Sequence, residues 1–121
     1  MRVLVVDDDP MAGEMTAAIL EDLEHETVLA ENGVEAAELV GAGPPFDLVL
    51  CDQNMQMVTG IDLFRELRSQ QIMVPFILLT GSNPQKALAE EPGLDGCLLK
   101  DCTLMEQLPV VVAECLRACR T

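Results

Sequence analysis

Positively charged side chains are scarce in this sequence of 121 residues. Seven Lys and Arg residues stand against 21 Asp and Glu residues, which gives a formal net charge of −14. Nucleic-acid binding needs clustered cations that displace counterions, and anionic membrane surfaces repel an acidic chain. We therefore expect no direct contact with nucleic acid and no binding to a membrane surface.

Long apolar stretches and paired cysteine motifs are missing as well. No run approaches the roughly 18 apolar residues of a membrane span, and the apolar run at 3–6 is too short for a signal peptide. The five cysteines are odd in number and contain no C-x-x-C pair, so we interpret them as thiols in a reducing compartment. These absences predict a cytoplasmic location.

Apolar residues are present in the amount that one domain needs. They make up 50% of the chain, which at this length suits a single hydrophobic core. No internal repeat, low-complexity tract or linker interrupts the sequence. We expect one domain over residues 1–121.

Five short apolar runs alternate with segments of helical period. Most of the runs are continuous, which is typical of strands in a parallel sheet that is covered on both faces. This alternation predicts an α/β fold with right-handed crossovers. The apolar runs are 3–6, 27–30, 48–51, 76–79 and 97–99. The helical segments are about 10–23, 33–40, 60–69 and 84–91, with a last helix that ends near Arg120.

Local signals define the helix ends. We expect Asp9, Asn32 and Thr59 to cap the first three helices, with Pro10 at the first helical position of the first. Because proline inside a helix removes a hydrogen bond, we expect the last helix to begin near Pro109, after a turn at 103–108. The apolar face of the first helix is predicted to carry Met11, Met15, Ala18, Ile19 and Leu23.

Polar residues follow the apolar runs at the carboxyl ends of the predicted strands, where open α/β sheets bind ligands. They are Asp7, Asp8 and Asp9 after the first run, Asp52, Gln53 and Asn54 after the third, Thr80 after the fourth and Lys100 after the fifth. Each feature alone also has a structural explanation, such as a helix cap or a solvated lysine. Their combination at one rim is what indicates a site.

A divalent cation would relieve the repulsion among these carboxylates. Mg²⁺ or Mn²⁺ suits oxygen ligands, with Asp8 and Asp52 bound directly, the backbone carbonyl of Asn54 as a further ligand and Asp7 acting through water. Asp52 lies centrally and is the predicted nucleophile toward phosphorus. Thr80 and Lys100 would stabilise the oxygens of the phosphoryl group during transfer.

The sequence as a whole resembles the receiver domains of response regulators, including the chemotaxis receivers. The matching segments are 5–10, 30–33, 47–52, Met55 with Gly60, 79–81 and 98–100. The resemblance implies a doubly wound, flavodoxin-like (βα)₅ fold with strand order 2-1-3-4-5. It also implies phosphorylation of Asp52 by a phosphohistidine on a histidine kinase or histidine phosphotransfer protein. Metal binding would fall to Asp7, Asp8 and Asp52, switch sensing to Thr80 and phosphoryl contact to Lys100. The output would pass to a downstream protein or to an output domain that this sequence lacks.

Three positions depart from the family pattern. Asp101 and Gln56 stand where the family usually has Pro, and Cys97 stands where it often has Tyr or Phe. We expect a trans peptide bond between Lys100 and Asp101, because a cis bond without proline is costly. Cys97 cannot perform the aromatic rotation by which the family often reports phosphorylation.

Two other functions remain open from the sequence. One is a docking module that works without phosphorylation and keeps the fold and some site residues. Its affinity for a partner would be the same with and without phosphorylation. A phosphohydrolase with an aspartyl nucleophile would usually place that residue after the first strand and add a cap domain, for which this chain has no material. Otherwise we expect no enzymatic activity beyond phosphorylation and dephosphorylation of Asp52 itself.

Overall fold

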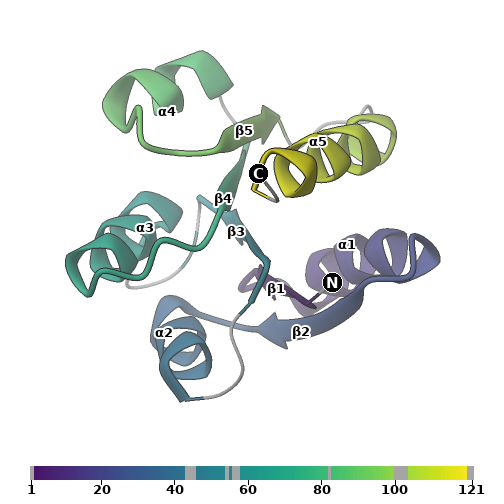
Figure 1. Ribbon diagram of the computed structural model, residues 1–121, viewed down its shortest axis with the longest axis horizontal. Helices are drawn as coiled ribbons and strands as arrows, with labels where there is room; N and C mark the ends of the chain where they lie inside the picture. The colour runs from purple at the N-terminus through teal and green to yellow at the C-terminus, as the bar shows by residue number, and fades with distance from the viewer. Residues whose placement is uncertain are drawn as a thin grey trace.

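A parallel five-stranded sheet forms the centre of the molecule. The computed structural model describes residues 2–42, 46–53, 55, 58–81, 83–99 and 104–119, with side chains in the last range at 106–114. The strands are β1 (Arg2–Val6), β2 (Glu26–Ala30), β3 (Leu48–Asp52), β4 (Phe76–Thr80) and β5 (Gly96–Leu99). Their order is β2-β1-β3-β4-β5, which confirms the predicted doubly wound α/β fold (Figure 1).

The continuous apolar runs became the inner strands of this sheet. Every residue of β3 and β4 is buried, because helices cover both faces of a parallel sheet. β2 lies at an edge and has exposed residues, which agrees with its less continuous apolar pattern.

Five helices form two layers around the sheet. The helices are α1 (Pro10–Asp22), α2 (Gly33–Ala42), α3 (Gly60–Ser69), α4 (Pro84–Glu90) and α5 (Leu104–Cys119). α2, α3 and α4 cover one face, and α1 and α5 cover the other (Figure 1). The cores on the two faces are separate, one containing Phe64 and Phe76 and the other containing Leu20 and Leu108.

The predicted N-caps are confirmed. Oδ1 of Asp9 accepts a hydrogen bond from the amide of Met11 at 3.0 Å, and Oδ1 of Asn32 accepts one from Glu35 at 2.8 Å. Thr59 and Asp62 form a complete capping box at α3. These bonds satisfy amides that the helices themselves leave without partners, so they define where each helix starts.

The predicted buried face of α1 is wrong. The helix buries Gly13, Thr16, Ala17 and Leu20, whereas Met11 is 74% exposed and Met15 is 59% exposed. Ala18 and Leu23 are exposed too, and Ile19 is half-buried. Apolar residues of α1 occur on most sides of the helix, so their spacing in the sequence did not identify the buried face. Small residues face the sheet because they let the helix lie close to it, and a Cβ on Gly13 would lie 3.5 Å from Cδ2 of Leu29.

The predicted start of α5 is also wrong. The helix begins at Leu104 and continues through Pro109. Proline inside a helix costs about 3 kcal/mol, but full burial of one aliphatic side chain contributes about 1.5–3 kcal/mol. Leu108 and Val112, on either side of Pro109, are both completely buried against the sheet. Their combined burial offsets the loss of the backbone hydrogen bond.

Within the part of the chain that the structure describes, no helix is both long enough and apolar enough to cross a membrane.

Candidate functional site

The carboxylates after β1 and β3 meet at one edge of the sheet. β1 and β3 are neighbours with Val6 opposite Cys51, so Asp7, just after β1, and Asp52, the last residue of β3, lie side by side. Asp7 is 4% exposed and Asp52 is 5% exposed, whereas Asp8 faces solvent. One carboxylate oxygen from each of these three residues lies within 4.8 Å of the others. The structure therefore brings together the three acids that the sequence singled out.

The three consecutive acids after β1 have different structural roles. The amide of Asp7 donates to the carbonyl oxygen of Ala30 at 3.0 Å, which ties this segment to the end of β2. Oδ1 of Asp7 accepts a hydrogen bond from the amide of Asp9 at 2.9 Å, and Asp9 in turn caps α1. The side chain of Asp7 is thus oriented by the chain that follows it. Asp8, between them, is exposed to solvent, whereas Asp7 is buried.

Gln53 holds the connection that leaves Asp52. Its amide donates to the carbonyl oxygen of Leu79 at 2.8 Å, and its own carbonyl oxygen accepts from Gly60 at 3.2 Å. Its side-chain Oε1 accepts from the amide of Ile61 at 3.0 Å. These bonds fasten the end of β3 to β4 and to the beginning of α3. The sequence indicated only the position of Gln53 after Asp52 and gave no signal for this bridging role.

Thr80 lies at the same edge, at the end of β4. Asp52 pairs with Leu79 in the register of β3 and β4, so Thr80 is one residue further along, and it is 2% exposed. Thr80 lines a small polar groove of about 220 Å³, together with Gln53 and Lys86. Lys86 comes from the first part of α4 and was not anticipated, because only the placement of α4 brings it toward this edge.

Two predicted site residues lie outside the described residues. They are Lys100 and Asn54, and the departures Asp101 and Gln56 fall outside as well. Leu99, the last residue of β5, pairs with Thr80, so β5 ends at the same edge of the sheet as β4. Cys97 is half-buried and packs against the core under α2, α3 and α4.

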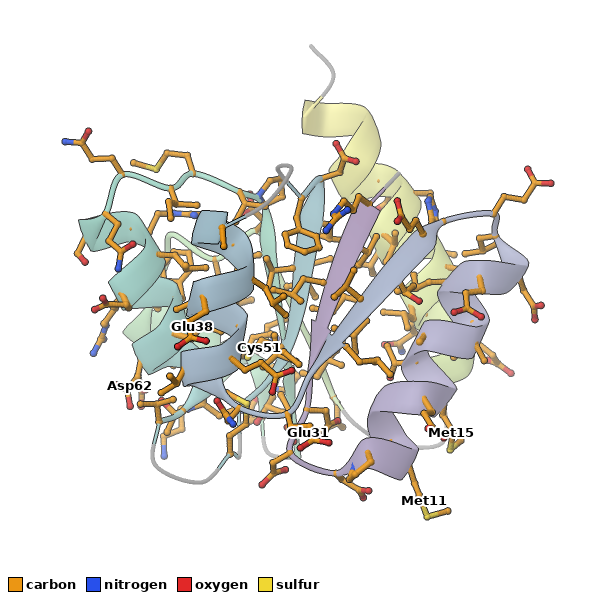
Figure 2. All side chains as sticks on the ribbon, turned by 90° about the horizontal axis from the view of Figure 1, so that it is seen from below. Met11, Met15, Glu31, Glu38, Cys51 and Asp62 are labelled. Carbon is orange, nitrogen blue, oxygen red and sulfur yellow. The ribbon has the colours of Figure 1, made fainter. Side chains whose placement is uncertain are left out.

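The interior beside the acids is apolar and electrostatically negative. Burial raises the pKa of the Cys51 thiol well above its usual value, and the neighbouring charges of Asp52 and Asp7 raise it further. Figure 2 shows Cys51 within the molecule, and Glu31 and Met11 at the end where β2 gives way to α2 and where α1 begins. Among the described residues, the side chains gathered at this edge that could hold a metal ion are the carboxylates of Asp7, Asp8 and Asp52. Oxygen ligands select hard cations such as Mg²⁺.

Comparison with known proteins decides the family. The sequence matches the family described as response regulator receiver domain over residues 3–112. The chain belongs to this family. As a receiver domain it is a module of two-component signal transduction, and its five parallel strands in the order 2-1-3-4-5 are those of the family.

Two sequence relatives support the assignment to this family. The receiver domain is 34% identical over 128 residues to the sensor histidine kinase RcsC of Salmonella typhimurium, covering 99% of this chain and 13% of that protein. It is 33% identical to a probable transcriptional regulatory protein of Picosynechococcus, covering 94% of this chain and 47% of that protein. The chain therefore spans less than half of either relative.

A solved structure resembles the receiver domain closely. The response regulator TrrA of Thermotoga maritima, in complex with Mg²⁺ and beryllium fluoride, superposes with a TM-score of 0.84 at 29% identity. The match covers 94% of this chain and 97% of TrrA. This likeness extends over nearly the whole length of both chains.

Proposed function

We propose that Asp52 accepts a phosphoryl group from a phosphohistidine on a partner protein, in a reaction that needs Mg²⁺ or Mn²⁺. The observation that carries this proposal is the meeting of the Asp7, Asp8 and Asp52 carboxylates within 4.8 Å. Like charges so close repel one another strongly. A hard divalent cation would offset this repulsion because the carboxylate oxygens would coordinate it. The solved complex of TrrA with Mg²⁺ and beryllium fluoride supports the same ligand for this receiver domain.

The transfer follows from the position of Asp52. An oxygen of its carboxylate forms a bond to phosphorus, the bond between phosphorus and the histidine nitrogen breaks, and the imidazole takes the bonding electrons. Asp52 is 5% exposed at the end of a central strand, so the packed sheet around it supports a fixed position for the nucleophile. A bound Mg²⁺ would offset negative charge on the phosphoryl oxygens.

The other residues would position the phosphoryl group or the cation. Asp7 and Asp8 would hold the cation with Asp52, and the backbone carbonyl of Asn54 would complete its protein ligands. The Thr80 hydroxyl and the Lys100 ammonium group would contact the phosphoryl oxygens. Thr80 is buried beside the end of β3, and the pairing of Leu99 with Thr80 supports a place for Lys100 nearby.

Receiver domains interact with histidine kinases and with downstream targets. For this chain we propose a histidine kinase or a histidine phosphotransfer protein as the donor, and a downstream protein or an output domain as the recipient of the signal. The only turnover that we propose is phosphorylation and hydrolysis at Asp52. The Salmonella typhimurium relative supports a phosphohistidine donor, because it is a sensor histidine kinase.

Phosphorylation from a small donor tests the proposal directly. The protein is incubated with acetyl phosphate in the presence of Mg²⁺ or of excess EDTA, and intact mass is measured. We expect one added phosphoryl group with Mg²⁺ only, and none in Asp52→Asn. Asp22→Asn, which removes an exposed carboxylate of α1, should be phosphorylated as the unchanged protein is. An unmodified mass with Mg²⁺, or equal modification of Asp52→Asn, would refute the proposal.

A further inference from the structure

A groove lies between α2 and α3, and its lining does not include Asp7, Asp8 or Asp52. It has a volume of about 450 Å³ and is lined by residues of both helices and by Val58, which precedes α3. Figure 1 shows α2 and α3 next to each other on one face of the sheet. The size falls in the range of ligand-binding pockets.

The floor and walls of the groove are apolar. Leu63 of α3 is buried, Ala37 of α2 is half-buried, and Val34 of α2 is 56% exposed. One end is closed by Val58, which lies so close to Gly33 that a Cβ on Gly33 would overlap its side chain. Two helices therefore expose an apolar surface to water in this groove, and burying that surface favours an apolar occupant.

The rim of the groove is acidic. Glu38 of α2 and Asp62 and Glu66 of α3 all line it, and all three are exposed. Figure 2 shows Glu38 and Asp62 on the same flank of the molecule. None of the described residues that line the groove carries a positive charge. An occupant would thus meet carboxylates from both helices, and the nearby Arg65, whose charge interacts with Asp62, does not line the groove.

Charge narrows the class of occupant. A second copy of this chain carries a net charge of −14, and two such copies repel each other. Nucleic acids and anionic lipid surfaces would be repelled by the same carboxylates. A segment with apolar side chains on one face and Lys or Arg residues beside them satisfies both the floor and the rim. Grooves of this kind bind amphipathic helices through side chains spaced three and four residues apart.

We propose that the groove between α2 and α3 binds a basic amphipathic helix of a partner protein. The apolar face of that helix enters between Val34 and Leu63, and its cations lie against Glu38, Asp62 and Glu66. The attraction is between exposed charges, so it weakens as salt rises, while the apolar contact is less sensitive to salt. This site is separate from the carboxylates at the strand ends, and binding is expected without phosphorylation of Asp52.

The test uses the whole unphosphorylated chain and a designed peptide. The peptide has about 14 residues, which would make about four helical turns when bound, with Leu at helical spacing and Lys elsewhere. Backbone amide correlation spectra are recorded during titration at low salt. We expect shifts concentrated at 33–38 and 58–66, and much weaker binding of a matched peptide that has Glu in place of Lys.

Two sets of variants locate the site. The double variant Glu38→Lys, Glu66→Lys should weaken binding about tenfold or more, because each change replaces an attraction with a repulsion. The control Glu14→Lys, Asp22→Lys changes the net charge equally on α1 and should retain binding. Val34→Ser should also weaken binding, whereas Val110→Ser on α5, at the same 56% exposure, should not.

Three outcomes would overturn the proposal. They are shifts centred on another surface such as the exposed methionines of α1, equal binding of the Lys and Glu peptides, and self-association through this groove in sedimentation measurements. Because Val34→Ser leaves the charges untouched, it keeps the test decisive even if the charge-reversed protein fails to fold.

Discussion

Gly60, the first residue of α3, lies directly against the backbone of Asp52. A Cβ atom at Gly60 would lie 2.9 Å from the carbonyl oxygen of Asp52 and 3.2 Å from Cα of Gln53. It would also overlap the side chain of Leu78. The start of α3 can reach this position only because residue 60 has no side chain, so the packing of α3 and the position of Asp52 depend on each other.

Replacement of Gly60 by Ala should therefore disturb both stability and phosphorylation. We expect the free energy of unfolding to fall by about 1–3 kcal/mol, because the backbone must move to make room. Phosphorylation by acetyl phosphate should slow as Asp52 is displaced. Gly41→Ala is the matched control, since nothing lies within 4 Å of its Cβ position in α2 and Ala favours a helix by about 1 kcal/mol. Urea unfolding that shows equal effects of the two changes would contradict this account.

Removal of one carboxylate should show how much the repulsion within the acidic cluster lowers the stability of the fold. In the absence of divalent cations, Asp8→Asn relieves repulsion among Asp7, Asp8 and Asp52 and should raise the melting temperature. Mg²⁺ at 100 times its dissociation constant should stabilise the unchanged protein by about 2.7 kcal/mol. Asp8→Asn should lose most of that gain. Thermal unfolding with Mg²⁺ and with EDTA measures both effects, and a melting temperature of Asp8→Asn below that of the unchanged protein in EDTA would argue against the cluster.

Two arginines of α3 should differ sharply in their importance. Nη1 of Arg68 donates to the carbonyl oxygens of Ile72 and Val74, both at 2.9 Å, and its guanidinium group lies 4.5 Å from the centre of the Phe64 ring. Arg68→Ala leaves these carbonyls without donors and should cost about 1–3 kcal/mol. Arg65 forms an exposed ion pair with Glu91, so Arg65→Ala should change stability very little. Chemical denaturation of both variants measures the difference. Similar losses in the free energy of unfolding would show that the two hydrogen bonds donated by Arg68 contribute little.

Cys51 should make the fold sensitive to alkaline conditions. Burial raises the pKa of its thiol in the folded state, whereas an unfolded cysteine titrates near 8.5. Its stabilising contribution is complete below about pH 8.5 and is lost as pH rises toward the folded pKa, because the unfolded chain then releases a proton that the folded chain retains.

The loss from this thiol should reach about 1.4 kcal/mol at about pH 9.5. Cys51→Ala removes the titrating group, so its stability should fall less between pH 7 and that value. Urea unfolding at both pH values measures the difference. In the folded protein, an alkylating reagent should modify the half-buried Cys97 before the fully buried Cys51. Rapid labelling of Cys51 under native conditions would show that the thiol is not enclosed.

Met11 should affect phosphotransfer only from a protein donor. It is 74% exposed at the start of α1, and its amide bonds to Asp9, the last of the acids after β1, so its side chain offers an apolar contact to a protein donor on this surface. Met11→Glu places a charge where an apolar contact would form and should slow transfer from a phosphorylated histidine kinase. Phosphorylation by acetyl phosphate should be unchanged, and a similar loss with both donors would mean that the substitution damages the site itself.

Much of this architecture was readable from the chain because it depends on local chemistry. Continuous apolar runs identify strands that are covered on both sides, and Asp9, Asn32 and Thr59 identify helix starts because their side chains bond to nearby amides. The acids after β1 and β3 could be placed at one edge because parallel strands all end on the same side. Gln53 could not be interpreted in this way, since its partners come from β4 and from the start of α3.

The sequence by itself determined the succession of strands and helices along the chain and the set of acids at the sheet edge. The succession follows from short-range patterns, and the grouping of the acids follows from the topology of parallel strands. Tertiary structure alone decided which side of α1 is buried, since apolar residues surround that helix and only the close approach of Gly13 and Ala17 to the sheet selects a face. It also decided that α5 continues through Pro109, where burial of Leu108 and Val112 outweighs a lost hydrogen bond. Both outcomes depend on packing energies between distant parts of the chain, which no local pattern contains.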